Sequence, residues 1–211
     1  MPPDPDQKRS ATADEIRLAA LEQFAQVGYA ATSMRDIAGS VGIKAASLYN
    51  HFGSKEAMLW DLTLAAFEEL ILSRDAAMAA LPITATAPDR LAGFVSAHVA
   101  FHAHHSNQAL LVNSQLAALT KSHYRKAVAL RTAYEITLRK VIDAGVGTGD
   151  FATPDARVST FAILQMGMAV SAWYRPEGSL SVKDLCAIYA ELALKMLDPS
   201  GDRSPGKRLR T

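Results

Sequence analysis

The chain has 211 residues, of which 49% are hydrophobic, and 22 Lys and Arg against 21 Asp and Glu give it a formal net charge of +1. A chain of this length and composition buries a full core, which excludes the small folds that depend on disulfides or structural metals. The nearly balanced charge excludes binding to nucleic acid by bulk charge alone, so a DNA-binding function has to be argued from motifs.

Cysteine usage and the N-terminal segment bear on the compartment. Cys186 is the only cysteine, and the N-terminus shows no charged segment followed by an apolar run and a small-residue cleavage site. Both observations favour a reducing, cytoplasmic compartment over secretion. No apolar stretch reaches the roughly 18 residues that a membrane-spanning helix needs. We therefore expect a cytoplasmic protein with no membrane partner.

Two capping signals predict the first helices. Thr12 begins a capping-box signature, Thr-Ala-Asp-Glu, which predicts a first helix that ends at Gly28. Residues 1–10, before this signature, are expected to be a disordered arm. Ser33 begins a second cap, so a short second helix is expected to end at Gly42.

The third and fourth helices follow without a long connection. Residues 45–51 are expected to form another short helix, and Ser54 caps a longer one whose apolar stripe fades before Pro82. The segment 82–88 is a predicted linker, because prolines bound it and no apolar period runs through it.

Beyond the linker the apolar pattern is helical throughout. It predicts a long helix over residues 122–144, which the glycine cluster at 145–149 ends, and two more helices over residues 155–174 and 181–197. No strand-like alternation of useful length is present. We therefore expect an all-α fold of about nine helices, followed by a disordered tail over residues 199–211.

Residues 33–51 carry the spacing of a helix-turn-helix. That motif needs a small residue where two helices cross, a glycine for the sharp turn and an apolar residue that anchors the second helix. Ala38, Gly42 and Leu48 supply these in order. The alternative is that these residues are only the core of a three-helix unit, but it leaves the polar and aromatic run at residues 49–51 without a reason.

The block from Ile16 to Glu56 resembles the DNA-binding domain of the tetracycline-repressor (TetR) family. The segments that carry the resemblance are residues 16–24, 28–29, 32–34, 37–38, 48–52 and 55–56. The resemblance implies that the short third helix enters the major groove of double-stranded operator DNA, and that the chain is a transcriptional regulator.

The resemblance also implies roles for individual residues. Ser47 and Asn50 would face the bases, with Lys44 and Ala46 at the start of the same helix, and Asn50 suits adenine. The chain departs from the family pattern at Ala45, where a lysine is common. Side chains expected to contact phosphates are Tyr49, His51, Thr32 and Lys55, and the helix starts at Met34 and Lys55 add backbone donors. The full predicted DNA-binding set is Thr32, Ser33, Met34, Arg35, Lys44, Ala45, Ala46, Ser47, Tyr49, Asn50, His51 and Lys55.

The C-terminal helices carry too many apolar residues for one chain to cover. The helix at residues 158–174 is apolar nearly all round, and a terminal helical hairpin cannot bury both of its faces alone. A second copy of the chain would cover the remaining face in a two-fold four-helix bundle. The predicted dimer contacts are Phe161, Leu164, Met168, Leu185, Ile188, Leu192 and Met196.

Three further segments, residues 98–102, 110–119 and 173–181, look like regulators of acyl-CoA and lipid catabolism within the family. This resemblance implies a pocket for a small hydrophobic effector, such as an acyl-CoA, that releases the repressor from its operator. The predicted lining residues, each of which also suits a plain core position, are Phe94, His98, Phe101, Val112, Tyr134, Gln165 and Met166. The expected organisation is therefore a DNA-binding domain over residues 11–55 and an effector-binding and dimerisation domain over residues 56–198.

A metal site is the first alternative use of these side chains. His98, His102 and His105 lie at i, i+4 and i+7 on one helical face, a spacing that can hold zinc. No acidic or cysteine side chain nearby in the sequence completes a tetrahedral site, so we expect neither a metal nor a cofactor. Cys186 is interpreted as a small core residue.

Two other classes of protein stand as alternatives. An enzyme is disfavoured because common catalytic motifs are absent and the glycine-rich segment 145–149 follows a helix, whereas a dinucleotide fingerprint follows a strand. A non-catalytic interaction protein would bind no operator and would be insensitive to substitution of Tyr49 and Asn50. Activation is the alternative to repression, since both use the same motif.

Overall fold

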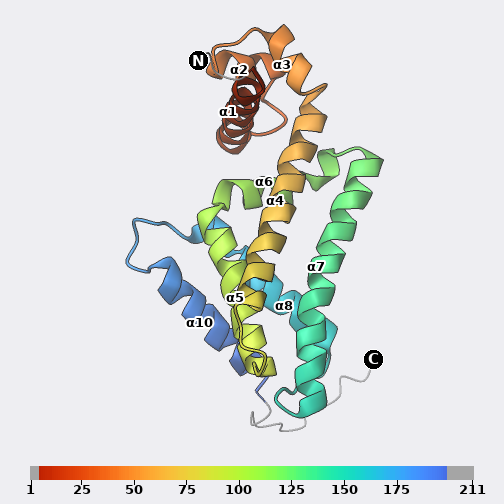
Figure 1. The fold of residues 1–211 in the computed structure, drawn as a ribbon, viewed down its shortest axis with the longest axis vertical. Helices are drawn as coiled ribbons and strands as arrows, with labels where there is room; N and C mark the ends of the chain where they lie inside the picture. Colours follow the sequence, from red (N-terminus) through yellow and green to blue (C-terminus); the bar gives the residue numbers. More distant parts are fainter. Residues whose placement is uncertain (1–4, 199–211) are drawn as a thin grey trace.

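Helices are the only regular secondary structure among residues 5–198, the part of the chain that the computed structural model describes (Figure 1). Their bounds are α1 Pro5–Gln26, α2 Met34–Ser40, α3 Ala45–His51, α4 Lys55–Ala79, α5 Ala87–His104, α6 Ser106–Gln115, the 3-10 turn η1 Leu116–Ala118, α7 Lys121–Thr148, α8 Ala156–Met168, α9 Val170–Trp173 and α10 Val182–Met196. Helix α9 continues α8 after a break at Ala169, so counting the two together gives nine α-helices over this range. The all-α prediction is confirmed.

The first helix differs from its expected start. Helix α1 begins at Pro5, not after Thr12, so residues 5–10 are helical where a disordered arm was expected. Proline is tolerated in the first turn of a helix, where its missing N–H has no partner to lose, and no helix breaker follows it before Gly28. Residues 1–4 of the expected arm and the expected tail at 199–211 lie outside the described residues.

The helix-turn-helix forms at one end of the molecule, where α1, α2 and α3 pack together (Figure 1). Ser33 caps α2 in a capping box, because its Oγ accepts from the Asp36 N–H while its own N–H donates to the Asp36 carboxylate. Gly42 makes the turn with φ +68°, a conformation that side chains other than glycine rarely adopt. Ile37 and Leu48 are fully buried, as the motif predicts.

Helix α4 leads from this end of the molecule into the larger helical bundle (Figure 1). It starts at Lys55, capped by the Ser54 hydroxyl, which accepts from the Ala57 N–H. Helix α5 lies at the centre of the bundle and packs against α4, α7, α8 and α10. Its buried face includes the fully enclosed Leu91 and Phe94. No helix within residues 5–198 combines the length and the apolar character that crossing a membrane requires.

The glycine cluster after the long helix acts differently from the prediction. Helix α7 runs through Gly145 and ends only at Gly149, which has φ +84°. Gly145 lies within the helix, and the Phe151 ring packs directly on it, so a Cβ at this position would collide with that ring. The returning Phe151 N–H also donates to the Gly145 carbonyl. The first glycine of the cluster therefore serves packing and the last one ends the helix.

Candidate DNA-binding and effector sites

Helix α3 presents nearly its whole surface to solvent. Leu48 is its one buried residue, and it anchors the helix on the core, while Ala45 is half-buried. Lys44, in an extended conformation, precedes the first turn as N-cap. The predicted DNA-binding residues that are exposed on or before this helix are Lys44, Ala46, Ser47, Tyr49, Asn50 and His51. A helix exposed in this way, held by one apolar anchor, has the geometry that major-groove docking requires.

The residues predicted around α2 divide into two groups. Ser33 and Arg35 are exposed, whereas Met34 and Thr32 are buried, Thr32 to 2% exposure. The Thr32 hydroxyl donates to backbone carbonyls of α1 and its end, with its closer partner the Gly28 oxygen at 2.9 Å. The expected phosphate contact of the Thr32 side chain is therefore wrong for this structure. Threonine closes the α1–α2 loop here, because its hydroxyl satisfies carbonyls that the end of α1 leaves unpaired.

Lys55 was also predicted to grip a phosphate, and its ammonium group is engaged elsewhere. Nζ donates to the carbonyl oxygens of Tyr29, Ala30 and Thr32, at 2.7, 3.3 and 2.8 Å, and lies 4.5 Å from the centre of the Tyr29 ring. An ammonium has three hydrogens, so these contacts use its donor capacity. The side chain ties the first turn of α4 to the α1–α2 loop, and only the backbone N–H groups of that turn stay as candidate phosphate donors.

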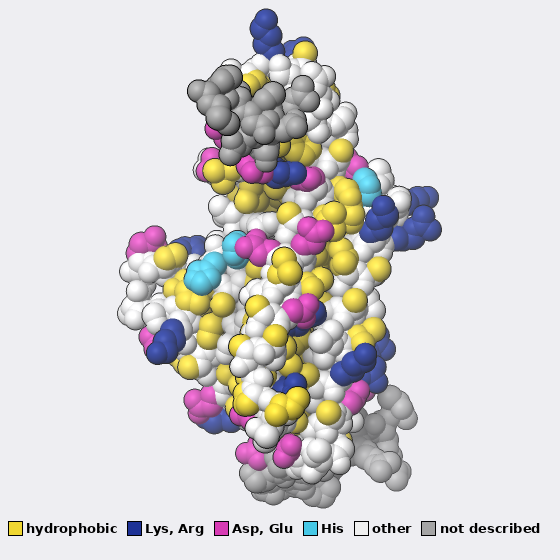
Figure 2. All heavy atoms as spheres, viewed as in Figure 1, with side chains coloured by type: hydrophobic (Ala, Val, Ile, Leu, Met, Phe, Trp, Pro, Cys, Tyr) yellow, Lys and Arg dark blue, Asp and Glu magenta, His cyan; other side chains and the backbone are white. Residues whose placement is uncertain are grey.

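The surface charge of the DNA-binding end is modest. Figure 2 shows Lys and Arg side chains scattered along the molecule, with few of them at the end that carries α1 to α3. Arg35 on α2 and Lys44 directly before α3 are the exposed cations of the helix-turn-helix over residues 33–51. The described residues of α2 and α3 therefore offer few cations for phosphate contacts.

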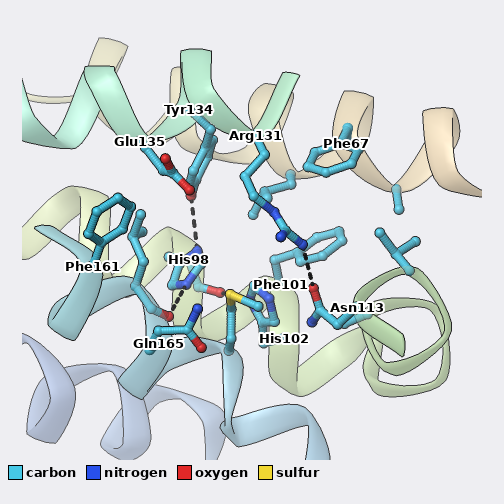
Figure 3. A pocket seen from close by; sticks show the side chains of 16 residues that line it. Phe67, His98, Phe101, His102, Asn113, Arg131, Tyr134, Glu135, Phe161 and Gln165 are labelled. Atoms are coloured by element: carbon cyan, nitrogen blue, oxygen red, sulfur yellow. Dashed lines mark hydrogen bonds between the residues drawn. The ribbon is translucent and has the colours of Figure 1, made fainter. Parts of the chain in front are cut away.

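A cavity of about 280 Å³ lies within the bundle, between α4, α5, α6, α7 and α8 (Figure 3). Most of its wall is apolar. Five of the seven predicted effector residues line it, namely His98, Phe101, Val112, Tyr134 and Gln165. Phe94 lies instead in the core, with its ring 5.0 Å from that of Tyr134, and Met166 is half-buried outside the cavity lining.

Helix α8 contributes to the cavity three residues that were predicted as dimer contacts. Phe161, Leu164 and Met168 all line it, and Leu164 is only 5% exposed. Leu185, on α10, is buried in the chain's own core. Leu164 and Leu185 are covered within the chain itself, whereas Phe161 lines the cavity and also stays exposed. A helix that is apolar nearly all round does not show in its sequence which face meets which partner. The apolar residues of α8 and α10 that stay largely exposed are Val158, Phe161, Ile188, Leu192 and Met196.

A chain of hydrogen bonds with a defined direction forms one wall of the cavity (Figure 3). His98 Nε2 lies 3.1 Å from the Leu164 carbonyl, which only accepts, so Nε2 carries the hydrogen and Nδ1 accepts from the Tyr134 hydroxyl at 3.2 Å. Burial, with a smaller effect of the neighbouring His102, lowers the pKa of His98 to about 3. Burial also raises the pKa of the Tyr134 hydroxyl. Both groups are therefore uncharged at neutral pH.

The close packing of His98 explains a glycine and bears on the alternative zinc site. A Cβ at Gly167 would collide with the His98 ring, so glycine lets α8 approach α5. His102 Nδ1 donates to the His98 carbonyl at 2.8 Å, and His105 Nε2 lies 3.2 Å from a Glu69 carboxylate oxygen. Because both His98 nitrogens are engaged in hydrogen bonds, the three histidines do not form a common site. Among residues 13–198, whose side chains the structure describes, no cluster of metal-ligating side chains is found.

Several cavity residues were missed by the sequence analysis. Arg131 and Glu135 reach the cavity from α7, and Asn113 from α6, with Arg131 Nη2 donating to the Asn113 side-chain oxygen at 3.4 Å. On a helix rich in Lys and Arg such residues look like a solvated face, and only the packing of α7 on α4 shows otherwise. A second hollow of about 300 Å³ adjoins the cavity, shares Glu135 and Phe161 with it, and is also lined by Thr132, Ile136, Arg139, Arg157 and Thr160.

Comparisons with known proteins match both parts of the chain. A family model described as "Bacterial regulatory proteins, tetR family" matches residues 16–62, and one described as "Tetracyclin repressor-like, C-terminal domain" matches residues 84–197. The transcriptional repressor KstR2 of Mycolicibacterium smegmatis is 30% identical over 208 residues, which cover 96% of this chain and 99% of that protein. KstR2 of Rhodococcus jostii is 28% identical, with 92% and 94% covered.

Solved structures share the fold. A tetR-family regulatory protein from Rhodococcus RHA1 superposes with a TM-score of 0.82 and 32% identity, covering 88% of this chain and 96% of that one. The ketosteroid transcriptional regulator KstR2 of Mycobacterium tuberculosis gives a TM-score of 0.80 at 25% identity, with 89% and 95% covered. The similarity therefore extends through the helices that form the cavity as well as through the helix-turn-helix.

Proposed function

Because this chain belongs to the TetR family of transcriptional regulators, we propose that α3 reads operator DNA and that an acyl thioester in the α4–α8 cavity releases it. The expectation of a ligand-responsive repressor, not an enzyme, is confirmed, since relatives matched over nearly the whole chain are transcriptional repressors. We place the protein in the cytoplasm, where its operator would lie.

One observation carries the coupling between ligand and DNA. The cavity is lined by Ala66, Phe67 and Leu70 of α4, the helix that begins at Lys55, directly after the recognition helix ends at His51. A ligand that displaces α4 therefore also displaces α3. An effector needs to favour the DNA-incompetent arrangement by only about 1 to 3 kcal/mol to release DNA substantially.

DNA recognition is proposed to use the exposed face of α3. Ser47 and Asn50 would contact base edges, with Lys44 and Ala46 entering first, while Tyr49 and His51 would contact phosphates. A dimer would place two such helices about 34 Å apart, to match successive major grooves. The exposed apolar surface of α8 and α10 supports this dimer, because a second copy would cover it.

The shape of the cavity favours an effector with an apolar part and an anionic part. About 280 Å³ accommodates an acyl chain or a small ring system but not a whole coenzyme A. The adjoining hollow brings Arg139 and Arg157 to the same side, and arginine suits phosphate groups. A solved structure with the same fold, AibR, is described in complex with isovaleryl coenzyme A and operator DNA, which supports an acyl-CoA as the class of effector here.

Fluorescence anisotropy tests this function. Labelled DNA from upstream of the gene and its neighbours would be titrated with the protein, and then with acyl-CoA thioesters, the matching free acids and unrelated hydrophobic drugs. We expect salt-sensitive binding to a promoter fragment and release by thioesters. Release by drugs alone would contradict the acyl thioester, and binding to no fragment would contradict the assignment of α3 as the DNA reader.

Two variants and one control sharpen that experiment. The double variant Tyr49→Ala, Asn50→Ala should lose promoter binding while it stays folded, because both side chains are exposed on α3. Ile83→Ala is the control, since Ile83 is 96% exposed in the connection between α4 and α5, beyond the end of α4 that is farther from α3. Arg157→Gln should weaken the effect of a thioester and leave that of the free acid unchanged.

A further inference from the structure

The carboxylate of Glu56 joins the first turn of α4 to the beginning of α7. Its Oε1 accepts from the backbone N–H of Thr120 and from Nδ1 of His123, both at 2.8 Å. The Glu56 and His123 side chains are only 21% and 26% exposed. Burial acts to raise the pKa of Glu56, but these hydrogen bonds lower it further, so the pKa lies below its ordinary value. A carboxylate at this position is also favoured by the N-terminus of α7.

The His123 ring is fixed by a second residue of α4. Trp60 stacks on it with the ring centres 4.7 Å apart and the planes within 3°. Glu56 and Trp60 are one helical turn apart, so they lie on the same face of α4. A hydrogen bond and a stacked ring therefore hold one side chain from two directions, which restricts both the distance and the rotation between the two helices.

The neighbouring residue makes the opposite connection. Lys55 binds the carbonyl oxygens of Tyr29, Ala30 and Thr32 in the α1–α2 loop. Two consecutive residues of α4 thus hold the DNA-binding helices on one side and α7 on the other. Since α3 ends only a few residues earlier, the orientation of the recognition helix depends on this turn of α4.

We propose that Glu56 and His123 form a joint that positions the DNA-binding helices on the effector-binding bundle, and that operator recognition depends on it. The inference rests on the proposed function. Along both helices the joint precedes the cavity, which begins at Ala66 on α4 and at Arg131 on α7. Beyond the first cavity residues the two helices meet again, where the Arg74 guanidinium lies 5.1 Å from the centre of the Tyr134 ring. The joint is therefore the α4–α7 contact nearest to α3 among those described. It fixes the position of α4 relative to α7, which an occupant of the cavity would disturb.

Two variants weaken the joint with little change of shape. Glu56→Gln keeps an acceptor for the Thr120 N–H and loses the charge, and His123→Phe keeps a ring to stack on Trp60 and loses the donor. Glu68→Gln is the matched control, because Glu68 is exposed on the same helix. Binding would be measured by anisotropy with the promoter fragment and with a scrambled fragment of equal length, and the melting temperature would be followed for every variant.

Positioning and plain stabilisation predict different results. If the joint positions the DNA-binding helices, promoter affinity should fall by roughly three- to tenfold in both variants, because a smaller fraction of the protein has the competent arrangement. Affinity for scrambled DNA should not change, because each helix-turn-helix is intact. An equal loss on both DNA fragments, or no loss on the promoter at an unchanged melting temperature, would overturn the inference.

A measurement without DNA separates this inference from the proposed function. Spin labels would be placed by Ala25→Cys on α1 and Lys140→Cys on α7, both exposed positions, in a Cys186→Ser background diluted with unlabelled protein. Pulsed electron resonance should give a broader distance distribution in Glu56→Gln and His123→Phe than in Glu68→Gln. Equal widths would refute the joint, even if the wild-type protein bound no promoter fragment and the proposed function failed.

Discussion

The buried His98 should make the stability of this protein depend on pH. Its pKa is about 3 in the folded chain, mainly because of burial, against an ordinary value of about 6.5 when unfolded. Between these two values the unfolded chain binds a proton that the folded chain does not. The contribution of His98 to the free energy of unfolding is therefore fully present above about pH 6.5, and it is lost as the pH decreases from that value toward about 3. Near pH 5 the loss from this one group is about 2 kcal/mol of the free energy of unfolding.

The substitution His98→Gln isolates this effect. A glutamine offers an N–H to the Leu164 carbonyl and an oxygen to the Tyr134 hydroxyl, but it has no proton to gain in this pH range. Urea unfolding would be followed by far-UV circular dichroism near pH 8 and near pH 5, at one protein concentration. The decrease in the free energy of unfolding from pH 8 to pH 5 should be about 2 kcal/mol smaller in the variant than in the wild type. His104→Gln, at an exposed position of α5, serves as the control. The reasoning fails if His98→Gln keeps the acid sensitivity of the wild type, or if the control loses it.

Three more substitutions test contacts around the cavity and the α4 start. Tyr134→Phe leaves the buried His98 Nδ1 without a donor, so thermal unfolding should reveal a loss of about 1 to 3 kcal/mol; an unchanged melting temperature would contradict a stabilising hydrogen bond between these two side chains. Gly167→Ala forces a Cβ against the His98 ring and should lower the free energy of unfolding in urea by about 1 to 3 kcal/mol. Gly147→Ala, on the open side of α7, should instead raise it by up to about 1 kcal/mol, and equal effects at both sites would refute the packing argument. Lys55→Met should destabilise the fold by about 1 to 3 kcal/mol yet leave the salt dependence of promoter binding unchanged, whereas a shallower dependence would show that its ammonium contacts phosphate after all.

Local signals in the sequence were sufficient for the helix-turn-helix. The third helix was expected over residues 45–51 and forms over Ala45–His51, because its cap, its turn glycine and its apolar anchor all lie within a short stretch of chain. The caps at Ser33 and Ser54 were found for the same reason. Each of these features depends on residues that are close together in the sequence, so it can be predicted without knowing how distant helices pack.

The cavity was predicted only in part, because its wall depends on how helices turn toward one another. His98 and Tyr134 were found, but Met166 was chosen where Met168 lies in the wall, since both residues suit a helix that is apolar on several faces. Arg131 was missed, and Lys55 was given the wrong contacts, because a cation on an exposed-looking helix carries no local sign of the carbonyl or amide that it meets across the fold.

The direction of the hydrogen bonds around His98 has a consequence for selectivity. The Tyr134 hydroxyl gives its hydrogen to His98, His98 gives its own to Leu164, and His102 gives its own to the His98 carbonyl. With both imidazoles neutral, what these side chains retain is lone pairs, on His102 Nε2 and on the tyrosine oxygen. His98, His102 and Tyr134 therefore offer hydrogen-bond acceptors to the cavity, and its N–H donors are the side chains of Arg131, Asn113 and Gln165. A carbonyl group in the cavity would therefore find its hydrogen-bond donors on these residues and not on the His98 side chain or its two neighbours.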